Sequence, residues 1–291
     1  AAAKADGRAA LIAYLPAGFP TPIDCVPVIA AMVENGVDAV EIGLPYSDPL
    51  MDGPVIQTAV DLALKAGIRI GDVMSNVGGV VGTGAPTLVM SYWNPIERYG
   101  VDRFASELAA VGGCGVITPD LTPEEAVPWI EATDEHGIDR VFLVAPSSSD
   151  ERIETVAATC SGFVYAASTM GVTGARTSVS SSAPELVARV RKHTNLPVCV
   201  GLGVSTGSQA ADVAEYADGV IVGSAFVKAL LESPTPGEGA AAVAALAAEL
   251  AGGVRGNRPA GVRSRTFGQD HAATDSFGVE GFAGPAPAST G

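Results

Sequence analysis

Short apolar runs alternate along this chain with longer stretches in which apolar residues recur at helical spacing. The run 11–17 is followed by the stretch 22–35, in which Val26 and Ile29 lie three residues apart and which stops at Gly36. Short apolar runs are typical of buried strands, and spacings of three or four residues are typical of a helix with one buried face. Glycine is common just after a helix. The first part of the chain therefore predicts a strand followed by a helix.

The same unit recurs through most of the sequence. Strands are expected at 11–17, 39–44, 87–92, 115–119, 140–145, 163–167, 198–201 and 219–222. Helices are expected at 22–35, 55–65, 70–81, 101–111, 123–136, 150–160, 184–193, 208–216, from about 225, and at 237–251. Eight strand-helix alternations in about 250 residues predict an α/β protein, a (β/α)8 TIM barrel with extra short helices.

The pattern changes near the C-terminal end. Residues 1–251 are expected to form the barrel as a catalytic domain, whereas 252–291 lose apolar periodicity and become rich in Gly, Pro, Ser and Ala. Such composition is typical of a flexible, disordered tail. The alternative is an added lid or docking segment with Phe267, Phe277 and Phe282 as its anchors.

Composition narrows the class of protein. A hydrophobic content of 47% supports a large buried core, and a net charge of -15 argues against a nucleic-acid partner. The apolar run 11–15 is short and broken by Pro16, so it predicts a strand rather than a signal peptide. From the sequence we expect no apolar run of the length needed to span a bilayer, and no membrane association.

Cysteine usage indicates a reducing compartment. Cys25, Cys114, Cys160 and Cys199 lie far apart and form no CxxC pair. Zinc sites usually need such pairs, and isolated thiols are the default in a cytosolic enzyme. The sequence predicts a cytoplasmic chain without a metal site.

The stretch DAVEIGLPYSDPLMDGPVIQ carries the most informative residues. Glu41 interrupts an otherwise apolar strand, where an ionisable side chain costs several kcal/mol unless it is paired or neutralised. Asp52 follows in a loop restricted by prolines and Gly53. Two acids in different environments suit acid/base chemistry. In the alternative interpretation, Glu41 is a barrel residue satisfied by an arginine and Asp52 is an ordinary turn residue.

In such barrels the active site lies at the C-terminal ends of the strands. The candidate acid/base groups expected there are Glu41, Asp48, Asp52, Tyr92, Asp120 and Tyr165. No histidine is expected at a strand end, and no lysine, which argues against a Schiff-base aldolase.

Small residues after the last two strands form a second pattern. Gly203 follows strand 198–201, and Gly223 with Ser224 follows strand 219–222, just before a short helix. Backbone N–H groups of such loops and of a helix N-terminus commonly bind phosphate. The sequence predicts a phosphate site here, with Gly174 as a candidate further donor.

With these residues in place, the chain resembles the alpha subunit of tryptophan synthase over about 11–251. The most specific match is EIGLPYSDPLMDGPVIQ, residues 41–57. Supporting matches are Tyr165 with GVTGAR (171–176), PDLTPEE (119–125), GLGVS (201–205) and VGSAFVK (222–228).

The resemblance implies an enzyme of tryptophan biosynthesis, a carbon–carbon lyase. It implies retro-aldol cleavage of indole-3-glycerol phosphate to indole and glyceraldehyde 3-phosphate, with indole passed to a beta subunit in an α2β2 complex. No cofactor is implied for this chain, and pyridoxal phosphate is implied only for the beta subunit.

The resemblance also implies roles for individual residues. Glu41 matches the principal acid/base, Asp52 the carboxylate that stabilises positive charge at the indole N–H, and Tyr165 a supporting residue. The positions that match apolar side chains of the indole pocket, each of which could equally be barrel core, are Tyr14, Ile56, Met90 and Ile117. The positions that match a closing lid and the beta-subunit contact are Thr173, Asp48 and Pro49.

One position departs from the resemblance. Phe19 stands between Gly18 and Pro20, where the family commonly has an acid.

The sequence leaves two other functions open. One is another phosphate-binding barrel, such as indole-3-glycerol phosphate synthase or a sugar-phosphate isomerase, and the former should need a lysine at a strand end. The other is a non-catalytic regulatory barrel, against which intact Glu41 and Asp52 argue.

Overall fold

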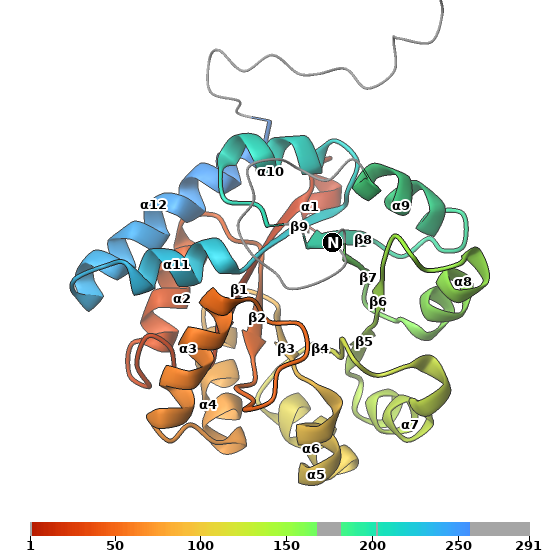
Figure 1. Cartoon of the computed structure of the whole chain (residues 1–291), viewed down its shortest axis with the longest axis horizontal. Helices are drawn as coiled ribbons and strands as arrows, with labels where there is room; N and C mark the ends of the chain where they lie inside the picture. The colour runs from red at the N-terminus through yellow and green to blue at the C-terminus, as the bar shows by residue number, and fades with distance from the viewer. Residues whose placement is uncertain (1, 168–181, 202, 257–291) are drawn as a thin grey trace, which may run out of the picture. The chain divides into compact units, whose positions relative to one another are not determined.

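The computed structural model describes residues 2–167, 182–201 and 203–256 of the chain. Its strands form one parallel sheet in the order β5-β4-β3-β2-β1-β9-β8-β7-β6. The strands are β1 (Ala10–Pro16), β2 (Ala39–Gly43), β3 (Thr87–Met90), β4 (Gly115–Ile117), β5 (Asp139–Val141), β6 (Leu143–Val144), β7 (Val164–Ala167), β8 (Val198–Gly201) and β9 (Gly219–Val222). They lie at the centre with the helices around them (Figure 1).

The sheet closes on itself through the fifth expected strand. β5 and β6 are separated by one residue, Phe142, and together cover residues 139–144. β5 pairs with β4, and β6 pairs with β7. The carbonyl of Phe142 accepts a hydrogen bond from the N–H of Tyr165 at 3.1 Å. The nine short strands therefore make an eight-stranded barrel, and the predicted fold class is confirmed.

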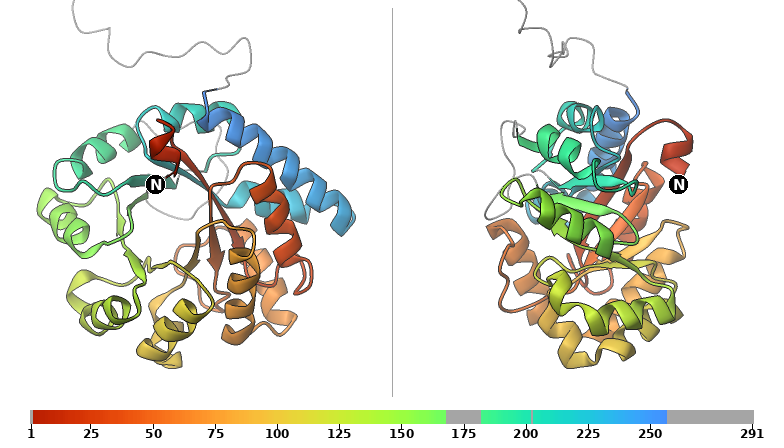
Figure 2. Two further views of the ribbon diagram at one scale, coloured as in Figure 1. Left: turned by 180° about the vertical axis from the view of Figure 1, so that it is seen from behind. Right: turned by 90° about the vertical axis from the view of Figure 1, so that its right-hand side faces the viewer.

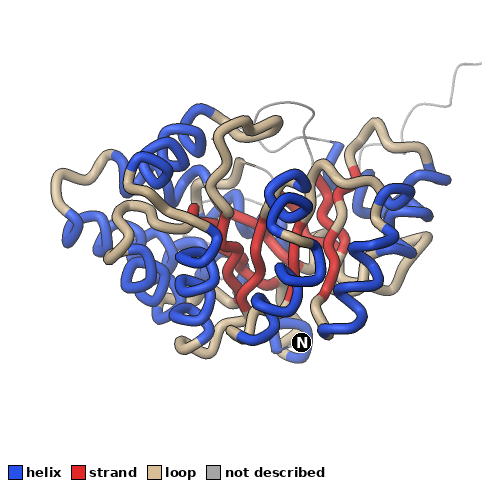
Figure 3. The backbone as a smooth tube through the Cα atoms, turned by 90° about the horizontal axis from the view of Figure 1, so that it is seen from below, coloured by secondary structure: helices blue, strands red, loops and turns tan. Residues whose placement is uncertain are grey.

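The helices cover the outside of the barrel (Figure 3). They are α1 (Ala2–Ala5), α2 (Cys25–Glu34), α3 (Pro54–Lys65), α4 (Ile70–Val81), α5 (Trp93–Tyr99), α6 (Val101–Ala110), the 3-10 helix η1 (Pro123–Glu125), α7 (Val127–His136), α8 (Asp150–Thr159), α9 (Ser182–Val190), α10 (Gly207–Ala214), α11 (Ser224–Leu231) and α12 (Pro236–Val254). Local signals explain several boundaries. Pro54 opens α3, Gly137 ends α7 in the left-handed conformation, and the Thr235 hydroxyl accepts from the Glu238 N–H at the start of α12.

Two helices were not expected from the sequence. α1 lies before β1, at the end of the barrel where the strands begin (Figure 2). α5 has little apolar periodicity, and its first N–H, from Trp93, donates to Oδ1 of Asp120 at 2.9 Å. Because that cap comes from the loop after the next strand, nothing local to the α5 sequence reveals it.

The helix α12 corrects one expectation. Its 19 residues, with a mean hydropathy of 1.2, are long and apolar enough to cross a membrane by length and composition. In the structure this helix packs against α2, α10 and α11 and buries Val243, Ala247 and Leu250. Its apolar surface is used to cover the barrel. The helix also continues to Val254, past the expected domain boundary at 251, and residues 257–291 lie outside the described residues.

Alternate residues along the strands divide the core into two clusters. In β2, Val40 and Ile42 belong to the large cluster that includes the helix residues, so they face outward from the barrel. The second cluster holds the inward-facing residues Ile12, Leu88, Ile117, Val141, Phe163, Cys199 and Ile221. Glu41 lies between Val40 and Ile42 and therefore points into the barrel.

Candidate active site

Glu41 is a buried carboxyl group without a counter-ion. Its side chain is 1% exposed, and neither carboxylate oxygen has a hydrogen-bond partner among the residues that the structure describes. Burial raises the pKa of Glu41 to about 8, because water no longer stabilises the charged form. The alternative in which an arginine satisfies Glu41 is not supported. At pH 7 the neutral form of Glu41 therefore predominates.

Asp52 lies in the loop between β2 and α3, and Tyr92 holds that loop. The Tyr92 hydroxyl accepts a hydrogen bond from the Met51 N–H at 3.0 Å and donates one to the Asp52 carboxylate. Burial raises the pKa of Asp52, and the hydrogen bond from Tyr92 acts in the opposite direction. Glu41 within β2 and Asp52 in the loop that follows it are thus two carboxyl groups in different environments.

The sequence places Tyr92 among the acid/base candidates but indicates no role for it. In the structure it lies on Asp52, and burial together with that carboxylate raises the pKa of Tyr92 to about 12. It is therefore a stable neutral donor. Its position at the end of the expected strand 87–92 was the only signal in the sequence, and in the structure β3 ends two residues earlier, at Met90.

Tyr165 lies on β7 and faces Glu41 across the barrel. Burial, followed by the nearby Glu41 and Cys199, raises the pKa of Tyr165 well above its ordinary value. A Cβ placed on Gly201 would lie 2.2 Å from the Tyr165 hydroxyl oxygen, so this glycine makes room for the ring. The role of Tyr165 as a residue that supports the site stays a prediction.

The glycine-rich end of the barrel is formed by β8, β9 and α11. Gly203 has a φ of +39°, which side chains rarely adopt, and Gly223 precedes the first residue of α11, Ser224. The N–H groups at the start of α11 are therefore directed to the end of β9. Gly174, the further donor suggested by the sequence, lies outside the described residues, as does Thr173.

The four expected indole-pocket residues are placed differently. Ile117 belongs to the inward-facing cluster, and Met90 packs against it. Ile56, in the first turn of α3, is buried in the cluster between barrel and helices. Tyr14 lies on β1, two residues after the inward-facing Ile12, and pairs in register with Glu41 on β2. Tyr14, Met90 and Ile117 thus lie on barrel strands, whereas Ile56 lies in the layer between barrel and helices.

The expected partner contact lies on an exposed loop. Asp48 is exposed, Pro49 is half-buried and Leu50 next to them is 72% exposed. Phe19, at the position where an acid was expected, is 2% exposed and packs in the outer cluster. It offers no polar contact from that position.

No lysine lies in a strand or directly after one in the described part of the chain. Lys4, Lys65 and Lys228 belong to α1, α3 and α11, and Lys192 follows α9. His136 ends α7. The expectation that the site has no Schiff-base lysine agrees with these placements.

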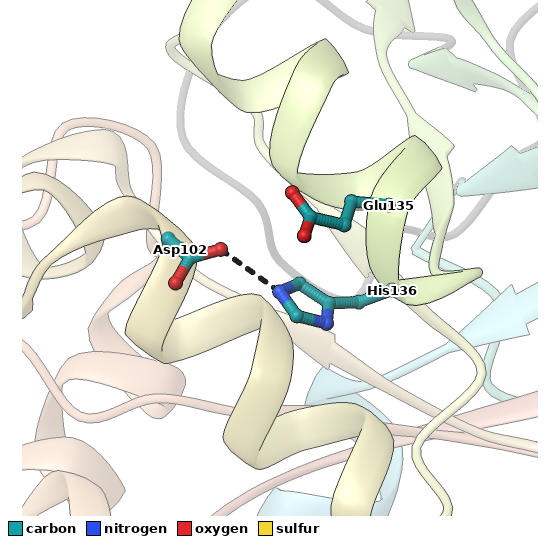
Figure 4. Close-up of side chains that lie close together, drawn as sticks. All are labelled: Asp102, Glu135 and His136. Atoms are coloured by element: carbon teal, nitrogen blue, oxygen red, sulfur yellow. Dashed lines mark hydrogen bonds and ion pairs between the residues drawn. The ribbon is translucent and has the colours of Figure 1, made fainter.

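A separate group of possible metal ligands lies on the outside of the barrel. Ligand atoms of Asp102, Glu135 and His136 lie within 4.8 Å of one another (Figure 4). Nε2 of His136 lies 2.9 Å from Oδ1 of Asp102, whose side chain is 75% exposed. An ion pair between α6 and α7 explains this proximity, and we assign no metal to it.

The likeness to known proteins extends beyond the site to the whole barrel. The family model described as tryptophan synthase alpha chain matches residues 1–254. The alpha chain of Streptomyces coelicolor is 60% identical over 257 residues, 88% of this chain and 95% of that protein. The corresponding chain of Thermobifida fusca is 58% identical over 258 residues, 88% of this chain and 96% of that protein.

Solved structures show the same relationship. A chain of the Mycobacterium tuberculosis tryptophan synthase aligns with a TM-score of 0.82 and 53% identity, covering 87% of this chain and 95% of that one. A chain of the Pyrococcus furiosus tryptophan synthase α2β2 complex aligns with a TM-score of 0.77 and 34% identity, covering 84% and 98%. On this likeness in sequence and structure, the chain belongs to the tryptophan synthase alpha chain family.

Proposed function

We propose that Glu41 and Asp52 are the two carboxyl groups with which this chain cleaves indole-3-glycerol phosphate to indole and glyceraldehyde 3-phosphate. The lyase activity, a step of tryptophan biosynthesis, is that of the family. The observation that supports the residue assignment is the burial of Glu41 inside the barrel, with its pKa raised to about 8. A general acid should have a pKa close to the working pH.

The proposed reaction uses Glu41 twice. Its neutral carboxyl donates a proton to C3 of the indole ring, which then carries a positive charge shared with the ring nitrogen. The Asp52 carboxylate stabilises that charge at the N–H. The bond between C3 and the side chain then breaks, and its electron pair returns to the ring as the side-chain hydroxyl becomes an aldehyde. Glu41, now ionised, takes the hydroxyl proton and is neutral again.

The remaining site residues are proposed to bind the substrate. Gly203, Gly223 and Ser224 offer backbone N–H groups to the phosphate, supported by the start of α11 at Ser224. Gly174 is proposed as a further donor and Thr173 as part of a lid, on the resemblance alone. The indole ring would lie against apolar side chains of the inward-facing cluster, such as Ile117 and Met90.

We further propose that the chain needs no cofactor, since protonation of C3 makes the indole ring itself the electron acceptor. Pyridoxal phosphate is proposed to belong to the beta subunit. A cytoplasmic location is supported by the cysteines, all four of which are free thiols.

The partner is proposed to be a tryptophan synthase beta subunit in an α2β2 complex. The Pyrococcus furiosus relative is such a complex. In this chain the loop carrying Asp48 and Pro49 also exposes Leu50 at 72%. An exposed leucine beside a charged residue suits a protein interface. Indole formation with and without added beta subunit tests this part of the proposal.

The residue assignment is tested by Glu41→Gln and Asp52→Asn, with indole formation from indole-3-glycerol phosphate as the assay. Each variant should lose at least about a hundredfold in kcat, the smaller end of a general acid/base contribution. Glu34→Gln, at an exposed position on α2, is the control and should retain activity. Glu41→Gln with near wild-type turnover would show that another group moves the protons.

A further inference from the structure

Asp120 joins the loop after β4 to the helix that follows β3. Its Oδ1 accepts a hydrogen bond from the Trp93 N–H, the first N–H of α5, at 2.9 Å. The first N–H groups of a helix have no partner within it, and the residue just before the helix usually supplies one from its side chain. Here that residue is Tyr92, whose side chain makes no such bond. Asp120 therefore takes the place of a local cap and fixes the backbone directly after Tyr92.

The Tyr92 side chain leads from this cap to Asp52. Tyr92 is 6% exposed, and its ring centre lies 5.7 Å from that of Tyr46. Its hydroxyl accepts a hydrogen bond from the Met51 N–H at 3.0 Å and donates one to the Asp52 carboxylate. A continuous set of contacts thus runs from Asp120 through Tyr92 to Asp52, across the loops after three successive strands.

The helix that Asp120 caps is short. α5 has seven residues, and Ile96 is the buried one among them. Helices of this length are not stable in water by themselves and depend on tertiary contacts. The first turn also packs the Trp93 ring edge-on against Trp129, with 5.9 Å between ring centroids. Loss of the Asp120 cap should therefore loosen the first turn of α5 and leave the barrel intact.

The charges around Asp52 give Asp120 no direct part. Burial raises the pKa of Asp52, and the hydrogen bond from Tyr92 acts in the opposite direction. The titratable groups that its charge affects are Tyr92 and Tyr14, and burial raises the pKa of both phenols, so both stay neutral. The Asp120 carboxylate is bound to the N–H of Trp93. An effect of Asp120 on Asp52 therefore passes through the position of Tyr92.

We propose that Asp120 is a positioning residue: by capping α5 it holds the Tyr92 hydroxyl against Asp52, and so directs that carboxylate at the substrate beside Glu41. A small displacement of a reacting or stabilising group costs a large factor in rate. This role rests on the proposed function, in which Asp52 stabilises the positive charge at the indole N–H.

Two substitutions at position 120 test the proposal. Asp120→Ala removes the cap, and kcat for indole formation should fall at least about threefold, as for loss of a helix cap, with KM little changed. Because the hydrogen bond from Tyr92 lowers the pKa of Asp52, a weaker bond should move the acid limb of the kcat/KM–pH profile to higher pH. Asp120→Asn keeps the Oδ1 acceptor without the charge and should restore most of kcat and the wild-type acid limb. Equal losses in the two variants would overturn the proposal, since the charge of Asp120 would then be what matters.

A double substitution shows whether Asp120 acts through Tyr92. Tyr92→Phe removes the hydroxyl, and kcat should fall roughly tenfold or more, as for loss of a hydrogen bond to a charged group. Asp120→Ala added to Tyr92→Phe should change kcat and the acid limb little, because the contact that the cap maintains is already gone. Losses that simply add would show two independent effects and would overturn the proposal.

Thr235→Ala is the matched control, since the Thr235 hydroxyl caps α12 by accepting from the Glu238 N–H at 3.3 Å. It should lower stability as loss of a cap does and leave kcat and the acid limb unchanged. Wild-type kcat and acid limb in Asp120→Ala would overturn the proposal, as would a fall in kcat without a shift of the limb. If Asp120→Ala does not fold, Asp120→Ser, whose side chain is too short to reach the Trp93 N–H, gives the same test with the same outcomes.

The Asp52→Asn assay separates this inference from the function on which it rests. Loss of activity in Asp52→Asn with an unaffected Asp120→Ala would remove only the role of Asp120. Full activity in Asp52→Asn would remove the proposed function of Asp52 itself.

Discussion

In the proposed mechanism the charge state of a single residue controls the site, because Glu41 has to be neutral before it can protonate the substrate. Its pKa near 8 results from burial alone among the groups that the structure describes. Asp52 is less deeply buried and accepts a hydrogen bond from Tyr92. In the proposed mechanism it has to be ionised, whereas Glu41 has to be neutral. We therefore expect the enzyme to work only in the pH interval where Glu41 is protonated and Asp52 is not.

This requirement predicts the pH dependence of turnover. In the free chain, kcat/KM for indole formation should be constant near pH 7 and fall tenfold per pH unit well above pH 8, because Glu41 of the ligand-free protein loses its proton there. Stopped assays across pH 6 to about 10, with circular dichroism at each pH to show that the fold persists, measure this. If activity keeps rising as the pH passes the pKa of Glu41, the reaction does not need the protonated form of Glu41. A group that acts only as a base would then carry the reaction.

Gly43 provides a second residue-scale prediction. In Gly43→Ala the new Cβ would lie 2.3 Å from the Tyr14 hydroxyl oxygen and 2.6 Å from its Cζ, so the ring must move away from Gly43. Because Tyr14 is an expected indole-pocket residue, we expect at least a tenfold loss of kcat/KM and a loss of about 1 to 3 kcal/mol in unfolding free energy, as for an overpacked core. Gly71→Ala on α4, where a Cβ meets open space, is the control. Retention of full activity in Gly43→Ala would show that the position of the Tyr14 ring is not important.

The sequence is informative about residues whose type conflicts with their surroundings. A glutamate in an apolar strand singles out Glu41, and a loop rich in proline singles out Asp52. The contact between Tyr92 and Asp52 could not be predicted, since it joins loops after two different strands. The space that the Tyr14 ring fills depends likewise on Gly43 of one neighbouring strand and on Gly223, which follows the other.

At the scale of elements, the strands of the structure lie where apolar periodicity predicted them, and so do most of the helices. Apolar periodicity did not predict the elements whose boundaries depend on tertiary contacts. α5 begins at an N–H bound by Asp120, and the expected fifth strand is broken at Phe142. Neither the start of α5 nor the break at Phe142 is marked by a local pattern in the sequence. The apolar helix α12 has the composition of a membrane span, and only its packing shows that it covers the barrel.

The packing of α12 against α10 predicts a specific weak point. A Cβ placed on Gly253 would lie 2.1 Å from the carbonyl oxygen of Gly207, a backbone atom that cannot move aside easily. Gly253→Ala should therefore lower the unfolding free energy by about 1 to 3 kcal/mol. Gly237→Ala, in the first turn of the same helix with open space around it, should be neutral or slightly stabilising. Urea titrations of both variants compare them, and equal midpoints would show that the two helices separate without cost.

At the scale of the molecule, eight strand-helix units in about 250 residues predicted a closed barrel, because that number of units is typical of the (β/α)8 fold. The sequence could not predict which side chains meet inside it. Glu41 is the acidic residue among the buried positions of the described chain, and it lies in the barrel that the whole fold encloses. The stability of the molecule is therefore expected to depend on the protonation of Glu41.

That coupling gives a prediction for folding. Glu41 has an ordinary pKa of 4.5 and a pKa of about 8 in the folded chain, so between these values the folded state binds a proton that the unfolded state has lost. The contribution of Glu41 to unfolding free energy must then decrease as the pH rises from about 4.5 to 8, by on the order of 5 kcal/mol.

Glu41→Gln removes this pH-dependent contribution to the unfolding free energy, because the amide does not titrate. The unfolding free energy of the variant minus that of the wild type should therefore increase between about pH 5 and 8 and level off above it. Urea denaturation at each pH measures the difference, and Glu34→Gln at an exposed site should give a difference that does not change with pH. A difference for Glu41→Gln that is equally flat would mean that Glu41 is already ionised in the folded chain at neutral pH. The barrel would then have to stabilise that charge by contacts that the described residues do not provide.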